Sequence, residues 1–325
     1  MKTVIYEQQG NPPDVLRLVQ GPHRPPGPGE ARVEVLSAPI HNADLLQVQG
    51  LYGRSPKLPA TPGGEAVGRV LEVGEGVTGL PVGVLVFITT GATWTQQITA
   101  PAGAFIAMPP ADVDQLAMLV SSPATAHLML EGYGDLKPGD WLIQSAANSA
   151  VGSAVVQLAK ARGLRTVNIV RREEVVEGLV ALGADVVLVG TDDLTARVQE
   201  ATGGASIRLA FDAVGGEVFT RLLDVLAMGG SLVSYSQAEL GSASLTPGDL
   251  IFRQLTVHGF WLSQWFSSAS AEDRQALFGQ LVPLVASGQL RTAVDSTWSL
   301  DEVTEAVRRS MGGRRNGKVL LHPNG

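Results

Sequence analysis

Residues 141–172 read WLIQSAANSAVGSAVVQLAKARGLRTVNIVRR, and their pattern predicts a strand, a helix and a second strand in succession. The apolar runs WLIQSA (141–146) and TVNIV (166–170) have the length of buried strands. Between them, residues 150–162 have the apolar spacing of a helix. A unit of this kind is the building block of a parallel sheet.

The turn between the first strand and the helix, QSAANSAVGS (144–153), favours a dinucleotide site. Small residues there let backbone amides approach a pyrophosphate whose charge faces the helix N-terminus. Against the G-x-G-x-x-G template, Ala147 and Ser149 replace the first two glycines and only Gly152 remains. An ordinary strand–helix turn with small packing residues is the alternative, but the strand before and the helix after it favour the cofactor interpretation.

The same alternation continues to about residue 260. We predict further strands at 186–189, 207–213, 230–235 and 255–260, and helices over 173–182, 192–201 and 216–228. Six short strands that alternate with helices are typical of a doubly wound parallel sheet, the Rossmann fold. The fold class is therefore predicted as α/β.

The first third of the chain has a different texture. It is rich in Gly and Pro, and β-branched runs at 31–40, 64–77 and 81–88 are punctuated by glycine. This pattern predicts short antiparallel strands joined by tight turns, as in a small barrel.

The end of the chain is predicted to return to this first domain and complete its core. It holds a helix over 271–287, a strand near 291–298, a helix over 300–310 and a terminal strand, GKVLLH (317–322). We expect a catalytic domain of residues 1–118 completed by 266–325, and a cofactor domain of residues 119–265. A cofactor is expected in the cleft between the two, where ligands of such sheets usually bind.

The end of the second strand bears on the choice of cofactor. An NAD site would place an acidic residue there, whereas TVNIV runs into Arg171 and Arg172. Two guanidinium groups suit the 2′-phosphate of NADPH. Glu173 and Glu174 leave a second interpretation open, in which the arginines pair with them at a solvated helix start.

Composition narrows the class of partner. The 325 residues carry a formal net charge of −7, which argues against nucleic acid and against an anionic membrane surface and favours a small-molecule substrate. The chain has no cysteine and five histidines without helical ligand spacing, so we expect no metal. The strand-like start, without a charged and then apolar leader, predicts a cytoplasmic protein.

Taken together, the sequence resembles the medium-chain dehydrogenase/reductase superfamily over nearly its full length. Within it the chain is most similar to the trans-2-enoyl-CoA/ACP (2-enoyl thioester) reductases, next to the zeta-crystallin-like quinone oxidoreductases. The segments that carry the resemblance are HNADLLQVQGLYG (41–53), LPATPGGEAVGRVLEVG (58–74), ATWTQQ (92–97), QSAANSAVG (144–152), GLRTVNIVR (163–171) and GFWLSQW (259–265). The resemblance implies a GroES-like β-barrel catalytic domain beside the Rossmann domain.

The resemblance also implies a zinc-independent reaction with a tyrosine as proton donor. Zinc-dependent relatives have Cys and His where this chain has Ile40 and Gly64. The tyrosine of the family's Q-G-x-Y segment falls on Tyr52. Without the resemblance, Tyr52 could equally be a turn aromatic that packs over its loop. Glu65 is interpreted as a buried structural partner.

Further site residues follow from the resemblance alone. Those implied in cofactor binding are Ser122, Asn148, Ser149, Ala150, Val151, Gly152, Arg171, Arg172, Tyr235, Ser236, Phe260, Trp261, Leu262 and Lys318. Those implied in the substrate pocket are Asn42, Trp94 and Trp261. Trp94 and Trp261 could instead be core residues, and Lys318 could be a solvated strand end.

Three functions remain open on the sequence. The first is NADPH-dependent reduction of a 2-enoyl thioester, with hydride to Cβ and a proton from Tyr52. The second is an NADPH:quinone or enone oxidoreductase, and the third is a non-catalytic NADPH-binding protein. We also expect a homodimer formed by edge-to-edge pairing of LTVHGF (255–260) across a two-fold axis.

Overall fold

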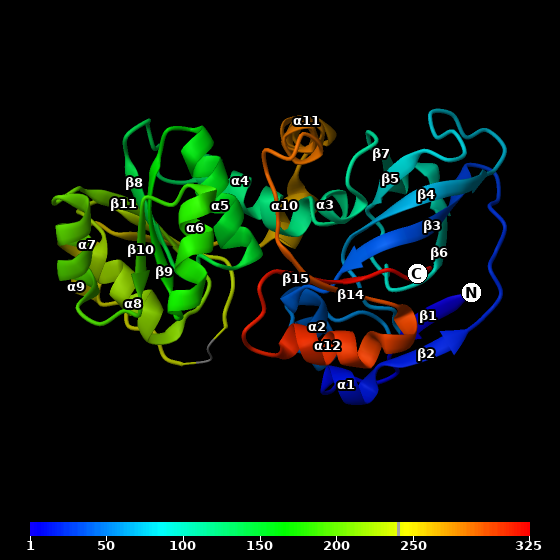
Figure 1. Cartoon of the computed structure of the whole chain (residues 1–325), viewed down its shortest axis with the longest axis horizontal. Helices are drawn as coiled ribbons and strands as arrows, with labels where there is room; N and C mark the ends of the chain where they lie inside the picture. The colour runs from blue at the N-terminus through cyan, green and yellow to red at the C-terminus, as the bar shows by residue number, and fades with distance from the viewer. Residues whose placement is uncertain (239–240) are drawn as a thin grey trace. The chain divides into compact units, whose positions relative to one another are not determined.

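The computed structural model describes residues 1–238 and 241–325, which form two compact units. Unit 1 consists of Met1–Ser121 and Phe278–Gly325, and unit 2 of Ser122–Leu277. Both are drawn in Figure 1, coloured along the chain. The chain passes between the units at two places only, because unit 1 contains both of its ends.

Unit 2 is built on a parallel sheet with the strand order β10-β9-β8-β11-β12-β13. Counted along the chain this order is 3-2-1-4-5-6, the order of the dinucleotide-binding doubly wound fold. The predicted Rossmann sheet is therefore confirmed. Its strands are β8 (Trp141–Gln144), β9 (Arg165–Val170), β10 (Val186–Val189), β11 (Ile207–Asp212), β12 (Ser231–Ser234) and β13 (Thr256–Gly259).

Helices cover both faces of this sheet, as the near-continuous apolar strands require. One buried cluster joins the strands to α5 (Ala150–Ala161) and α6 (Val176–Leu182), and a separate one joins them to α7 (Leu194–Thr202) and α8 (Gly216–Val225). Figure 1 shows α5 and α6 side by side on the near face. The remaining helices of the unit are α4 (Thr125–Gly132), η3 (Glu173–Val175), α9 (Pro247–Ile251) and α10 (Leu262–Ser268).

Unit 1 is built mainly on a seven-stranded sheet in which β3 (Glu30–Pro39) is central. Its first half pairs with β6 (Gln97–Pro101) and its last residues pair with β15 (Lys318–Leu321). On its other edge follow β4 (Ala66–Val73), β5 (Leu85–Ile88) and β7 (Phe105–Ala107), all antiparallel. The other strands are β14 (Val294–Trp298), which extends this sheet beyond β15, and the separate pair β1 (Lys2–Ile5) and β2 (Arg17–Gln20).

Helices connect these strands, and the sequence pattern predicted only those near the end of the chain. They are α1 (Pro12–Val15), α2 (Asn42–Gln49), η1 (Ala102–Ala104), α3 (Val113–Ala117), the π-helix η2 (Val120–Ala124), α11 (Ala271–Ala286), η4 (Leu300–Glu302) and α12 (Val303–Met311). Two of them cross unit boundaries, since η2 spans the change from Ser121 to Ser122 and α11 the change at residue 278.

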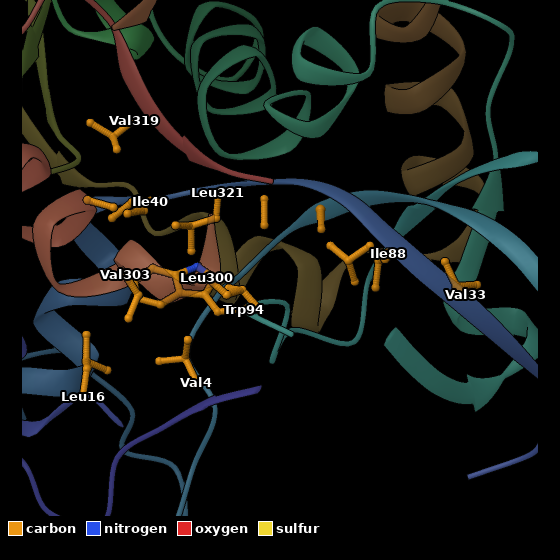
Figure 2. Close-up of a cluster of buried hydrophobic side chains, with 14 of the residues drawn as sticks. Val4, Leu16, Val33, Ile40, Ile88, Trp94, Leu300, Val303, Val319 and Leu321 are labelled. Atoms are coloured by element: carbon orange, nitrogen blue, oxygen red, sulfur yellow. The ribbon is translucent and has the colours of Figure 1, made fainter. Parts of the chain in front are cut away.

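The core of unit 1 draws on both ends of the chain. Figure 2 shows the side chains of Val4, Leu300, Val303 and Leu321 gathered around Trp94, and all five are buried in one cluster. β15 and α12 therefore complete this core. The fold class, a GroES-like domain with a Rossmann domain, is confirmed.

Candidate active site

The predicted phosphate turn lies between β8 and α5. Ser149 is the N-cap of α5, and its hydroxyl accepts a hydrogen bond from the Gly152 amide at 3.1 Å. A Cβ on Gly152 would lie 2.6 Å from the Ala147 carbonyl oxygen and 2.7 Å from its Cα, so only glycine fits. The last glycine of the dinucleotide template has this role of close helix–strand packing. Ala146 has a φ of 48°, so the turn contains a left-handed alanine.

Asp212, at the carboxyl end of β11, ties this turn to the neighbouring strands. It is fully buried and accepts hydrogen bonds from the Ser145 hydroxyl at 3.0 Å and from the amides of Val214 and Gly215. Ser145 in turn accepts from the Ala213 amide at 2.9 Å. From β8 the chain continues outward to β9 and β10 on one side, and from β11 to β12 and β13 on the other side. The strand order therefore reverses between β8 and β11, and ligands of open α/β sheets bind at the carboxyl ends of the strands at such a point.

Tyr235 follows β12 and reaches the same turn. Its hydroxyl is buried, and burial raises the pKa of Tyr235 above the usual value, while the nearby Ser149 side chain acts in the opposite direction. Asp212 raises it further. The phenol therefore stays protonated and is a hydrogen-bond donor beside the N-cap of α5. Ser236, the next residue, is partly exposed.

The other predicted cofactor residues of unit 2 follow the carboxyl ends of the remaining strands. Arg171 and Arg172 come directly after β9, and Phe260, Trp261 and Leu262 directly after β13. The Phe260 amide donates to the Ser234 carbonyl at 2.9 Å, so the segments after β12 and β13 are adjacent. Because all strands are parallel, the sheet brings these residues to one edge, together with Asn148, Ala150 and Val151.

Of the two interpretations of the arginine pair, the structure shows a contact for one, the pairing with a glutamate. Arg171 is exposed at the end of β9. The Arg172 guanidinium lies 3.2 Å from the Glu174 carboxylate, and the Glu174 side chain is 62% exposed. An exposed pair of this kind is weak, so Glu174 would yield to a bound phosphate at little cost.

In unit 1, Tyr52 lies on a loop that begins where α2 ends. Gly50 ends α2 with a φ of 77°, and the Tyr52 amide donates back to the Leu46 carbonyl at 3.2 Å. A hydrogen bond of 3.1 Å from Gln9 to the Ser55 hydroxyl holds the far side of the loop. Tyr52 is half-buried. Asn42 is exposed at the opposite end of α2, so the helix separates these two predicted residues.

Trp94 is placed differently from the other predicted pocket residues. Its side chain has no exposed surface and packs in the core of unit 1 (Figure 2). The structure thus does not bring it to the surface of the unit. Of the two interpretations that the sequence left open for Trp94, this position is that of a core residue.

Lys318 is partly buried and belongs to a polar cluster that the sequence only partly indicated. Its Nζ lies 2.7 Å from Nδ1 of His41, and burial, with the charge of Arg315 second, lowers the pKa of Lys318 to about 8. His41 Nε2 lies 2.6 Å from the carboxylate of Glu65, which is 2% exposed. Asp44 accepts from the His41 amide at 2.8 Å. His41 and Asp44 were missed because helix α2 was not predicted.

Ser122 is 1% exposed and lies inside η2.

Among the described residues, no group of three or more His, Asp or Glu side chains is placed to hold a metal ion. Within the same residues no helix has the length and apolarity needed to cross a membrane.

Comparison with known families gives two matches. Residues 27–109 match the alcohol dehydrogenase GroES-like domain, and residues 150–278 match the zinc-binding dehydrogenase family. The first match lies in unit 1 and the second lies almost entirely in unit 2.

Individual proteins match over nearly the whole chain. The mitochondrial enoyl-[acyl-carrier-protein] reductase of Homo sapiens is 36% identical over 99% of this chain and 88% of its own. A structure assigned as an NADPH:quinone reductase from Bacillus thuringiensis is 28% identical, with a TM-score of 0.89 over 99% of this chain and 98% of its own. A mycobacterial protein complexed with NADPH is 26% identical, with a TM-score of 0.87 over 99% of this chain and 100% of its own.

Proposed function

The chain belongs to the enoyl-[acyl-carrier-protein] reductase family of the medium-chain dehydrogenase/reductase superfamily, and we propose that it reduces a 2-enoyl thioester with NADPH. The 36% identity with the human reductase over 99% of this chain carries the proposal. The carboxyl ends of the strands in unit 2 support it, because the predicted cofactor residues of that unit, apart from Ser122, gather there around the glycine turn.

We propose that the phosphate turn, from Asn148 to Gly152, holds the pyrophosphate and that Arg171 and Arg172 hold the 2′-phosphate. The phenol of Tyr235, kept protonated by burial, supplies a donor next to Ser149. Ser122, Ser236, Phe260, Trp261 and Leu262 are the proposed contacts toward the ribose and the nicotinamide. When bound, NADPH supplies the hydride that reduces the double bond.

Tyr52 is the proposed acid. Hydride addition at Cβ leaves an enolate, which needs a donor at its oxygen and a proton at Cα. A phenol is protonated at neutral pH and supplies both kinds of donor. The chain has no cysteine, and Ile40 and Gly64 stand where zinc-dependent relatives have ligands, so a side-chain acid must do the work of the metal. We propose that Asn42 and Trp261 contact the substrate.

A second candidate is reduction of a quinone or a free enone, favoured by the likeness to the Bacillus thuringiensis protein. Such substrates are already electrophilic and need less help from an acid. A non-catalytic NADPH-binding protein is the third candidate, and it predicts cofactor binding without turnover.

A substrate panel with Tyr52→Phe tests the proposal. NADPH absorbance is followed with crotonyl-CoA, a longer enoyl-CoA, a simple quinone and a free enone. We expect turnover of the enoyl thioesters and a loss of about 10²-fold in kcat for Tyr52→Phe, the usual scale for an acid–base group. Turnover of the quinone alone, unaffected by the substitution, would favour the second candidate. No turnover with intact NADPH binding would favour the third.

We further propose a homodimer, and the cytoplasm as its compartment, although the similar human protein is described as mitochondrial. The dimer is supported by β13, the last strand of the sheet among the described residues. Nearby, Ile251 and Phe252 are 64% and 77% exposed, and exposed apolar patches mark association surfaces. We propose that neither nucleic acid nor a membrane is a partner of the protein.

A further inference from the structure

Glu65 is a buried carboxylate that the proposed reaction does not use. A buried charge is costly unless it is paired and hydrogen-bonded, so its partners show what it holds in place. On one side, the amides of Val120 and Ser121 donate to it at 2.9 Å and 3.1 Å. On the other side lies His41 Nε2 at 2.6 Å, a close contact without the geometry of a hydrogen bond.

The state of the His41 ring is set by Lys318. A lysine ammonium has only donors, so Nδ1 of His41, 2.7 Å away, must accept. A neutral imidazole that accepts at Nδ1 carries its proton on Nε2, the nitrogen beside Glu65. With the proton on Nδ1 instead, the Nε2 lone pair would face the carboxylate, and the two would repel.

The two amides that donate to Glu65 lie where the chain passes from unit 1 to unit 2. Val120 opens the π-helix η2, Ser121 is the last residue of the first segment of unit 1, and Ser122 is the first residue of unit 2. π-helical turns are rare and frequent at functional sites. Pro123 has no backbone N–H, so one hydrogen bond fewer holds η2 in place. The hydrogen bonds that Glu65 accepts from this segment therefore matter more for its position.

We infer that Lys318, His41 and Glu65 form a positioning chain: Lys318 fixes the tautomer of His41, His41 pairs with Glu65, and Glu65 fixes the backbone that presents Ser122. None of the three is a catalytic residue in this account. The part that concerns NADPH rests on the proposed function, because it takes Ser122 as a cofactor contact.

Two measurements that need no turnover test the chain directly, at pH 7, where Lys318 is protonated. In nitrogen-15 spectra of the histidine rings, assigned with a His41→Asn variant, we expect the Nε2–H tautomer for His41 in the unmodified protein. In Lys318→Met the nitrogen-15 signal of Nδ1 should shift, because this nitrogen loses its donor. Hydrogen exchange at the amides of Val120 and Ser121 should accelerate about tenfold in Lys318→Met, and more in Glu65→Gln.

Lys2→Met is the matched control, because it removes a lysine of unit 1 that pairs with Asp301 at the surface. It should leave the His41 tautomer and both exchange rates unchanged. If Glu65→Gln does not fold, Lys318→Met alone decides the outcome. An Nδ1–H tautomer in the unmodified protein, or unchanged exchange in Lys318→Met, would overturn the chain.

The link to the cofactor is measured by titration with NADPH. We expect the Kd to rise about fivefold to tenfold in His41→Asn, at a residue that is no proposed cofactor contact, while kcat at saturating NADPH changes less than about twofold. A fall of kcat at unchanged Kd would overturn the link. Absence of NADPH binding in the unmodified protein would refute the proposed function, whereas the exchange and tautomer results would still stand or fall independently.

Discussion

At the scale of the residue, a single carboxylate in each unit accepts hydrogen bonds from several segments of the chain and holds them together. Asp295 in β14 illustrates this: it accepts two hydrogen bonds from Arg309 of α12, at 2.7 Å and 2.6 Å, and one from the Asn316 amide at 2.9 Å. The pKa of Asp295 is lowered to about 2, and the hydrogen bonds from Arg309 are the main cause. Asp295 thereby joins α12, and the loop that leads to Lys318, to β14.

Asp295→Asn should lower the melting temperature by about 2–4 °C at pH 7. The folded pKa of about 2 lies below the unfolded value of 3.8, so the carboxylate stabilises the fold above about pH 4. That contribution is lost as the pH falls through 2. Melting curves of both proteins between pH 7 and pH 2 should therefore approach each other below about pH 4 and meet near pH 2. A difference that is the same at every pH would contradict the assignment.

Residue roles were predictable where a motif carried them. Ser149 and Gly152 could be identified from the turn template, and the structure places both as the template requires. Asp212 and Ser145 could not be, because they are 67 residues apart and meet only when β8 and β11 pair. The same holds for His41 and Lys318, which are 277 residues apart.

At the scale of the element, the start of α5 depends on close approach of two backbones. Gly152 lies against Ala147, with no room for a side chain, and the clashing atoms belong to the backbone and cannot rotate away. The approach places the first turn of α5 over the end of β8, and a helix N-terminus in this position is suited to bind a phosphate.

Gly152→Ala should therefore push α5 off the sheet, lower stability and raise the Kd for NADPH at least tenfold. Gly178→Ala is the matched control, since Gly178 lies within α6 and an added Cβ would meet no atom within 4 Å. It should raise stability by about 0.5–1 kcal/mol and leave the Kd unchanged. Denaturant unfolding and NADPH titration check both. Equal affinity in the two variants would contradict the role of the turn.

Periodicity predicted elements well where short runs centred on apolar residues alternate with helices. This holds for all six strands of unit 2. It failed for α2, whose eight residues bury only Asp44, Leu45 and Val48 and mix polar with apolar side chains on every face. β6 was also missed, because GATWTQQITAP (91–101) has the composition of a loop and pairs with β3 only across a long sequence distance.

At the scale of the whole molecule, the exposed edge of unit 2 is where association is expected. Among the described residues no further strand pairs with the outer side of β13, and such an edge is a template for another strand. Met228 is 70% exposed, and a hydrogen bond of 2.9 Å from Gly229 to Arg253 joins its loop to the segment after α9. Met228, Ile251 and Phe252 thus add apolar surface near this edge.

Sedimentation should give a species of twice the 34.0 kDa chain mass at micromolar concentration. Phe252→Glu combined with Ile251→Glu should shift it to the monomer, because the paired surface would bury charges. Val82→Glu, at another exposed apolar residue, is the control and should leave the dimer intact. A monomeric unmodified protein at this concentration would refute the dimer.

The central claim is that hydride from NADPH reaches Cβ of an enoyl thioester while the proton at Cα comes from an acid in exchange with water. It is tested most directly by reducing crotonyl-CoA with NADPH deuterated at C4, on either face, and locating the label in the butyryl product. The account predicts deuterium at Cβ from one face only and none at Cα. Deuterium at Cα, or a product without label from both cofactors, would contradict it.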